Sequence, residues 1–422
     1  MLRATLTLLT GGALAQMVPL LLGPALARLF GPEAFGLFTA FSTIAASVAV
    51  VACARYEYAL PMAQDDAEAT ALLALALRIG LAVTLLSVPL AWALHVAGRL
   101  PVAWALPLSV AAAGLLQVFS LWANRAEAYR SLAASRFVQY AGAALLQTAL
   151  GLAIWRAGRG QAAGADAAWA LVLGPVVAVL LAALWLARRA PPGGWRALWQ
   201  VPAAALRGVA RRYRDFPLLN TPHAFLGTLQ DALAVALLIA WSGEAAAGFW
   251  GLALRYLKAP ATLVGSAVSQ ALYPRLTQSA PAEAQRAVRQ TMAVLALPAL
   301  GLMALLALAG PRLFEWAFGA PWRDAGELAR ALAPYIAAHF VAAPLAVVTM
   351  AWHGQRWAFR LALVGQAVFL LCLAWGLWTG GLLRGAWAVS AGMVIYFGYY
   401  FWRLAHWPHI PARGAAAGEA RA

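Results

Sequence analysis

Charged residues are scarce in this chain. They make up 11% of the 422 residues, and only 15 residues are acidic, whereas 64% are hydrophobic. Soluble domains are about one quarter charged and about half apolar. The apolar excess is spread along the whole chain, which excludes an ordinary soluble domain and predicts an all-α polytopic membrane protein.

Signatures of catalysis and of metal binding are also missing. The two cysteines, Cys53 and Cys372, lie in apolar runs and cannot form a metal site on their own, so we interpret them as small core residues. The histidines lack metal-ligand spacing, and phosphate-binding glycine loops and Ser-His-Asp patterns are absent. No outer loop is long enough to house an active site. We therefore expect no enzyme, no cofactor and no metal, and an ion gradient stays a candidate energy source.

The apolar runs are long enough for about twelve transmembrane helices by the ~20-residue criterion. They lie at 5–27, 35–54, 70–94, 103–123, 137–155, 167–187, 217–241, 248–272, 290–310, 327–351, 359–378 and 385–403. The first run follows Arg3 and imitates a signal peptide, but it continues to Ala27, so we interpret it as a retained helix. An even number of helices places both termini on one side of the membrane.

The distribution of basic residues predicts on which side of the membrane the termini lie. If the N-terminus is cytoplasmic, the cytoplasmic segments hold about three times as many arginines as the outer loops. The positive-inside rule therefore predicts that both termini are cytoplasmic. A net charge of +16 would suggest nucleic acid in a soluble protein. Here the basic residues fall in loops between apolar runs, so we expect contacts with lipid headgroups and no nucleic-acid partner.

The longest polar connection begins near Pro191-Pro192-Gly193-Gly194 and divides the helices into two blocks of six. We predict an N-terminal lobe at 1–190, a cytoplasmic linker with an amphipathic helix at 191–215, a C-terminal lobe at 216–405 and a cytoplasmic tail at 406–422. Similar short stretches around Gly36 and Gly248 lie about half the chain apart and favour related lobes. Transporters built from two such repeats bind their substrate between them and rock to alternate access.

Three ionisable residues fall inside the two helices of 216–274, which a turn at 242–248 separates. Asp231 lies about 21 Å from the cytoplasmic edge of a hydrocarbon core about 30 Å thick, and therefore about 9 Å from its outer edge. Arg255 lies about 10 Å from the outer edge, so the two residues are at matching depths. We predict that these two form a gating or structural ion pair, because an intramembrane charge is costly without a partner. Lys258 lies one turn beyond Arg255 on the same helix face, and we expect it to face a water-filled lumen.

Other polar residues at membrane depth have two readings. Arg78 and Arg330 lie near helix ends, where they can snorkel to the interface. Gln16, Gln139 and Gln270 line a polar path for sugars in one reading and form interhelical hydrogen bonds in the other.

Several stretches together resemble a known family. Near the N-terminus they are Leu8-Leu9-Thr10-Gly11, Pro24, Arg28-Leu29-Phe30-Gly31-Pro32-Glu33-Ala34-Phe35-Gly36 and Arg55-Tyr56-Glu57-Tyr58-Ala59, with Asp65, Asp66 and Glu68 after them. Further on they are Gly248-Phe249-Trp250, Arg255, Pro260 and Gln270-Ala271-Leu272-Tyr273-Pro274. The chain resembles oligosaccharide flippases of O-antigen and exopolysaccharide synthesis, polysaccharide biosynthesis proteins of the multidrug/oligosaccharidyl-lipid/polysaccharide exporter superfamily.

The resemblance implies a MATE-like pair of six-helix bundles in a bacterial inner membrane. The implied cargo is a polyprenyl-diphosphate-linked oligosaccharide, with membrane lipids and other polysaccharide assembly proteins as further partners. No catalytic residue can be transferred from this family. A cationic lumen is a theme of the family, and Arg255 and Lys258 fit it, since a diphosphate needs cations in a low-dielectric cavity.

Three rival functions stay open. A cation-coupled multidrug exporter of the same superfamily would need acidic groups in its cavity, and Asp231 is the clearest candidate. A membrane polysaccharide polymerase or ligase would use a large outer loop, which the sequence lacks. Flippases of peptidoglycan precursors resemble longer chains of fourteen helices.

Overall fold

The computed structural model describes residues 2–159, 164–188, 194–408 and 410, and over these residues it is helical without strands. Before the linker lie α1 (Leu2–Leu29), α2 (Pro32–Ala49), α3 (Asp66–Val96), α4 (Leu106–Arg125), α5 (Tyr129–Ile154) and α6 (Gly164–Ala187). The linker holds α7 (Gly194–Gln200) and α8 (Ala203–Arg212). After it come α9 (Thr221–Gln278), α10 (Pro281–Phe318), α11 (Arg323–Ala342), α12 (Ala346–Ala351) and α13 (Gln355–Ala405). The expected all-α class is confirmed.

Eight elements in the described part of the chain are long and apolar enough to cross a membrane. Two of them are pairs of helices joined at a kink, because the backbone is non-helical at Gly243 in α9 and at Gly380 and Gly381 in α13. Those eight elements therefore provide ten crossings. Together with α1 and α2, which are not among those eight, the described residues hold the twelve helices that the apolar runs predict.

Several predicted boundaries are wrong. The run expected at 137–155 is α5, which begins at Tyr129. The second run was expected to be helical over 35–54, but α2 ends at Ala49 and a 3-10 helix follows at Tyr56–Met62. Ala54 and Arg55 adopt left-handed φ values of 48° and 62°, which an α-helix does not allow. The run expected at 290–310 belongs to the longer α10, which extends from Pro281 to Phe318 and ends where Gly319 adopts a φ of 101°.

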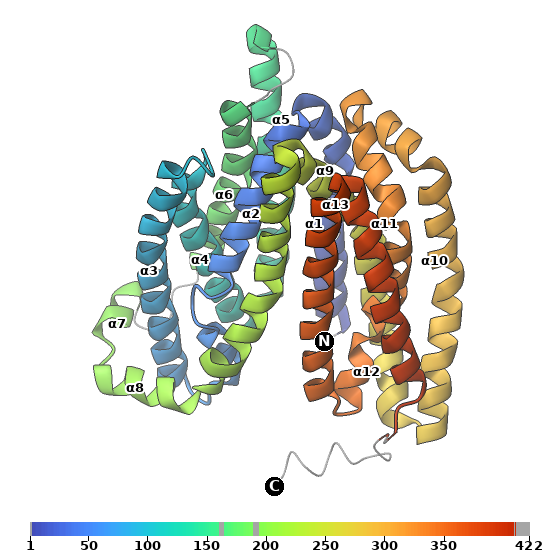
Figure 1. Ribbon diagram of the computed structural model, residues 1–422. Helices are drawn as coiled ribbons and strands as arrows, with labels where there is room; N and C mark the ends of the chain where they lie inside the picture. Colours follow the sequence, from blue (N-terminus) through green and yellow to red (C-terminus); the bar gives the residue numbers. More distant parts are fainter. Residues whose placement is uncertain (1, 160–163, 189–193, 409, 411–422) are drawn as a thin grey trace. The chain divides into compact units, whose positions relative to one another are not determined.

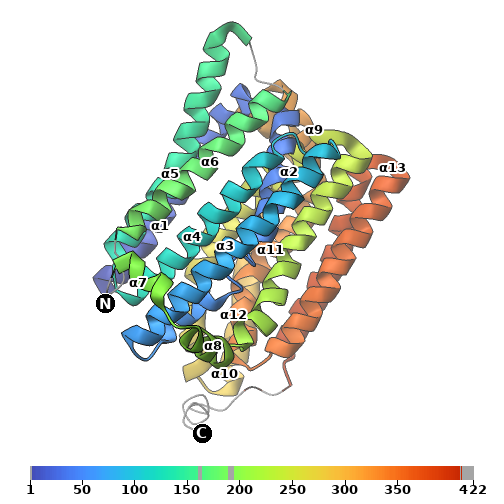
Figure 2. The same ribbon diagram turned by 90° about the vertical axis from the view of Figure 1, so that its left-hand side faces the viewer.

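The chain forms two compact units, Met1–Ala236 and Leu237–Ala422, and the division falls inside α9. The lobe boundaries expected around the linker stay a prediction. In the first unit, α4 packs against α2, α3 and α6, while α5 packs against α1 and α6 (Figures 1 and 2). Gln147 of α5 donates a hydrogen bond to the carbonyl oxygen of Leu171 in α6 at 2.7 Å, so this amide connects two helices.

The linker helices pack on α3 of the first unit (Figure 2). Arg78 of α3 does not snorkel freely, because its Nη2 atom donates to the carbonyl oxygens of Leu198 and Trp199 at the end of α7. Arg212 of α8 forms an ion pair with Glu68 of α3 at 2.9 Å. Chiefly burial, and next the Glu68 charge, raise the pKa of Tyr213, which follows α8. The linker is therefore anchored to one lobe.

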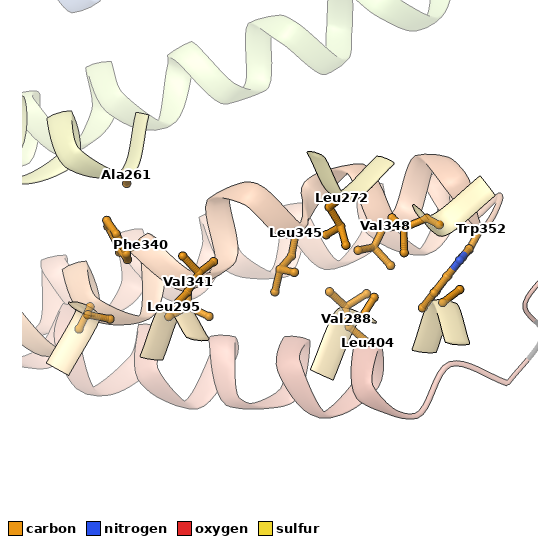
Figure 3. Close-up of a cluster of buried hydrophobic side chains, with 14 residues drawn as sticks. Ala261, Leu272, Val288, Leu295, Phe340, Val341, Leu345, Val348, Trp352 and Leu404 are labelled. Carbon is orange, nitrogen blue, oxygen red and sulfur yellow. The ribbon is translucent and has the colours of Figure 1, made fainter. Parts of the chain in front are cut away.

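The second unit has its own apolar core, in which helices far apart in sequence meet (Figure 3). Leu272 of α9, Val288 of α10, Leu345 just before α12 and Leu404 of α13 are all buried there. Close packing of such side chains drives association between membrane helices. This core fixes the second half of α9 against α11 and α13, and that half carries the predicted cationic residues.

Replacement of Gly243 by alanine is expected to destabilise the protein. Gly243 has φ 82° and ψ 177°, a backbone region that is essentially restricted to glycine, so a Cβ atom there costs about 1–3 kcal/mol. The measurement is the apparent midpoint of thermal unfolding in detergent. Gly227→Ala on the same helix is the control, because a Cβ there meets no atom within 4 Å. Equal midpoints for the two variants would contradict a strained hinge at Gly243.

Candidate functional site

Lys258 of α9 lies within electrostatic range of His339 in α11, and His339 belongs to a group of rings in the second unit. His339 is one turn after Tyr335, and their ring centroids are 6.0 Å apart. Phe397 of α13 lies 6.2 Å from His339 and stacks on Tyr335 at 6.3 Å with an interplanar angle of 16°. We refer to Lys258, Tyr335, His339 and Phe397 as the Lys258 cluster.

The sequence explains why these residues meet. Tyr335 and His339 are four residues apart and therefore share one face of α11. Ser390 of α13 donates a 2.6 Å hydrogen bond to the carbonyl oxygen of Ala331, which holds the half of α13 that carries Phe397 against α11. On the other side, Trp250 of α9 packs edge-on against Phe369 at 6.0 Å. The cluster is thus built from three helices of one rigid core.

Arg255 lies one turn before Lys258 on α9 and is exposed, whereas Lys258 is half-buried. The neighbouring Tyr256 packs against Phe318 of α10 at 4.8 Å, so the helix is fixed between these two residues. Asp231 is exposed on the half of α9 that belongs to the first unit. The Asp231–Arg255 pair would join the two units and stays a prediction, as does the lumen-facing role of Arg255 and Lys258.

The three predicted path glutamines lie on separate helices. Gln16 is exposed on α1 and Gln139 is half-buried on α5, both in the first unit. Gln270 is exposed on α9 in the second unit. Their role in a polar path stays a prediction.

A second polar cluster lies in the first unit, where α2 ends early. Glu57 is only 3% exposed, and its Oε2 atom and the buried Nε of Arg55 have no hydrogen-bond partner. The Arg55 guanidinium lies 4.8 Å from the Tyr58 ring centroid, and Gln117 of α4 donates to the Tyr58 hydroxyl at 2.9 Å. Strained backbone and unsatisfied buried polar groups gather at functional sites. Sequence reasoning used these residues only for a family resemblance.

Burial raises the pKa of Glu57, while its own backbone amide and the Arg55 charge oppose that shift. A carboxyl group whose folded pKa is raised stabilises the fold at acidic pH and loses that contribution as the pH rises through the folded pKa. Glu57→Gln is therefore expected to stay stable above the ordinary pKa of 4.5, where the parent protein weakens. Thermal unfolding in detergent across pH 4 to 8 measures this. A parallel loss in both proteins, or an equal effect of the exposed control Glu283→Gln, would contradict it.

Metal chemistry gains no support from this geometry. Among the residues that the structure describes, no three His, Cys, Asp or Glu side chains are grouped so that they could hold a metal ion. The geometry instead offers basic groups beside aromatic rings.

A family model for polysaccharide biosynthesis proteins matches residues 25–327, well over half of the chain. The chain belongs to the polysaccharide biosynthesis protein family. A search of the curated proteins finds no match. In this family member, Asp231, Arg255 and Lys258 lie within the matched residues, whereas Tyr335, His339 and Phe397 lie beyond them.

Solved structures show the same fold. The lipid II flippase MurJ in an inward closed conformation has a TM-score of 0.68 at 10% identity, over 93% of this chain and 89% of that one. An inward-facing multidrug resistance MATE transporter has a TM-score of 0.58 at 14% identity, over 93% and 96%. A transporter of the same superfamily from Pyrococcus furiosus has a TM-score of 0.55 at 17% identity, over 96% of each chain. The MATE-like fold expected from the sequence is confirmed.

Lys258 is also distinctive by residue type. Of the 31 basic residues, thirty are arginine, and Lys258 is the only lysine in the chain. The two side chains differ physically, because lysine carries a compact, strongly hydrated point charge whereas arginine carries a wide planar fork. Lys258 therefore stands out by residue type in a chain that uses arginine everywhere else.

Proposed function

We propose that this polysaccharide biosynthesis protein is a flippase. Its cargo is a polyprenyl-diphosphate-linked oligosaccharide repeat unit, carried from the cytoplasmic to the periplasmic leaflet of a bacterial inner membrane by alternating access. The observation that supports the proposal is the position of the only lysine, on an apolar helix and within electrostatic range of His339, whose ring lies near those of Tyr335 and Phe397.

The charge of the cargo explains the charge of the site. A cation at the bilayer centre costs about 3 kcal/mol or more, so it persists where it meets an anion or water. A diphosphate supplies an anion for both Lys258 and the exposed Arg255, and charge-assisted hydrogen bonds are the strong ones in a low-dielectric cavity. The rings offer apolar faces with polar edges to the glycan, while the prenyl chain can stay in the lipid.

The architecture suits a cycle of alternating access. Glycine kinks at Gly243 and Gly381 interrupt α9 and α13, and broken helices are a common feature of transporters. Solved relatives of the same fold are described in inward-facing and outward-facing conformations. The Pyrococcus furiosus relative is described as having a binding pocket of reversed polarity that suggests a different function. A cationic pocket here would be a comparable departure from drug export.

We further propose that both termini are cytoplasmic, that membrane lipids and other assembly proteins are partners, and that an ion gradient supplies the energy. The arginine bias between the two sides supports this orientation. Asp231 and Arg255 would then act as a gating pair at matching depth. No step of this cycle needs a bound cofactor.

The function is tested in a strain that lacks the gene. We expect lipid-linked oligosaccharide to accumulate on the cytoplasmic side and surface polysaccharide to disappear, with both restored by the wild-type chain. Susceptibility to a panel of cationic drugs should not change. Normal surface polysaccharide with new drug sensitivity would favour the multidrug exporter, and flipped but unpolymerised repeat units would favour a polymerase or ligase.

A further inference from the structure

A half-open apolar cavity of about 320 Å³ lies within the first unit, between α3, α4 and α7. Leu81 and Thr84 of α3 and Ala111 of α4 form its walls, Trp195 and Trp199 of α7 cover it, and Cys53 lies at its floor. Cys53 is only 4% exposed. The volume falls at the lower end of the range for small-molecule sites, about 300–1,000 Å³.

The cover of this cavity is held at both ends. Arg78 donates to the carbonyl oxygens of Leu198 at 3.3 Å and Trp199 at 3.1 Å, which fixes the last turn of α7. Trp195, near the other end, packs edge-on against Phe119 of α4 at 5.3 Å. Small residues hollow out the space beneath, since a Cβ atom on Gly80 would lie 3.4 Å from the sulfur of Cys53. The cavity is therefore a built feature of this fold.

The residues that line the cavity favour a hydrocarbon chain as its occupant. Thr84 is the one hydroxyl-bearing residue of the lining, and apolar cavities that lack two or more polar partners do not hold water well. Both α3 and α4 are candidate membrane spans, so the cavity lies where acyl chains are abundant. A lipid chain can enter such a cavity without leaving hydrocarbon surroundings.

The charged residues of α7 and α8 favour an anionic lipid headgroup. The cover and the adjacent α8 expose Arg196, Arg207 and Arg211, and Asp215 is the only acidic residue between Gly194 and Phe216. Each arginine near an anionic membrane surface contributes about 1 kcal/mol. We propose that the cavity holds one acyl chain of an anionic phospholipid, whose headgroup lies against the arginines of α7 and α8.

This lipid site is separate from the proposed cargo site, which lies in the other unit, and it does not rest on the proposed function. The acyl chain fills the space between α7 and the α3–α4 pair. The linker helices thereby become sensitive to the lipid composition of the membrane.

The test uses the full chain in vesicles of phosphatidylglycerol or phosphatidylcholine, each with a trace of the same lipid carrying a diazirine in its acyl chain. After irradiation, labelled peptides are mapped by mass spectrometry. Cys53 is the diagnostic position, because a chain in the bulk bilayer does not reach this buried residue. We expect Cys53 to be labelled about fivefold or more from phosphatidylglycerol, the ratio that corresponds to about 1 kcal/mol per arginine.

Two variants fill the cavity from different walls, Ala111→Phe and Thr84→Phe, and both should abolish labelling of Cys53. Leu108→Phe on α4 is the matched control, since Leu108 is exposed and does not line the cavity. Arg196→Ala with Arg207→Ala should remove the preference for phosphatidylglycerol. Unfolding midpoints identify any variant that fails to fold.

Three results would overturn the proposal. They are an unlabelled Cys53 in the wild-type chain, equal labelling from the two phospholipids, and labelling from a photoreactive polyprenyl phosphate but not from phosphatidylglycerol. The last result would assign the cavity to an isoprenoid chain instead.

Discussion

Replacement of Lys258 by alanine is expected to lower export of the lipid-linked glycan by about 10- to 100-fold, because a hydrogen bond to a charged group is worth about 1.5–3 kcal/mol. The protein should still fold and reach the membrane, since Lys258 is half-buried and its backbone stays helical. Surface polysaccharide in a complemented deletion strain measures export, and the amount of membrane-inserted protein normalises it.

Conservative variants sharpen this prediction. Lys258→Arg keeps the charge but replaces a compact ammonium with a wide planar fork, so we expect it to recover export only in part. Arg312→Ala is the control for the general loss of one basic residue, because Arg312 is exposed on α10, a helix that contributes no residue to the cluster. If Lys258→Ala supports full export, the assigned role of Lys258 is wrong.

The single lysine also allows a chemical test. An amine-reactive reagent can modify only Lys258 and the N-terminal amine of this chain. Treatment should inactivate the wild-type protein and leave the residual activity of Lys258→Arg untouched. A cargo analogue that carries a diphosphate should protect Lys258, whereas the same glycan without phosphate should not. Equal inactivation of both proteins would place the effect elsewhere.

The number and kind of helices were predictable from the sequence because apolar runs of about twenty residues have few other uses. The end of α2 was not. Ala54 and Arg55 adopt left-handed backbone conformations without a glycine or proline to announce them, so the run looked continuous to residue 54. The turn at 242–248 was placed well, but its non-helical backbone is confined to Gly243.

Only the charged residues of the candidate site could be predicted from the sequence. Arg255 and Lys258 stand out in an apolar helix, and their spacing places them on one face. Tyr335, His339 and Phe397 do not stand out, because aromatic residues are common in membrane helices and their meeting depends on how α11 and α13 pack. The hydrogen bond from Ser390 to Ala331 and the stacking of Phe397 on Tyr335 are tertiary facts that one sequence does not carry.

Close packing of α10 on α11 is the second feature on which a large effect is expected. A Cβ atom on Gly326 of α11 would lie 2.4 Å from Cα of Pro311 and 2.6 Å from the carbonyl oxygen of Gly310, both backbone atoms of α10. Small residues at such crossings let membrane helices approach closely, and their packing drives association. Arg330 adds a hydrogen bond to the carbonyl oxygen of Ala307 at 3.0 Å across the same pair.

Gly326→Ala is therefore expected to destabilise the protein by about 1–3 kcal/mol, the usual cost of overpacking a well-packed core. The apparent unfolding midpoint in detergent should fall by about 2–4 °C for each kcal/mol. Gly301→Ala on α10 is the control, because a Cβ there meets no atom within 4 Å. Export per folded molecule should also fall, since α11 carries Tyr335 and His339 to Lys258.

Gly310→Ala is a third variant. It tests whether the loss of stability comes from the contact between α10 and α11 or from any added methyl group. A Cβ on Gly310 would lie 3.0 Å from the carbonyl oxygen of Gly326, so both substitutions push the same two helices apart. Once the helices have moved to accept the first methyl group, the second should cost less. The double variant is expected to lose less stability than the sum of the losses in the two single variants, because the effects of residues in contact are coupled. Strict additivity would mean that the two glycines do not share a crossing.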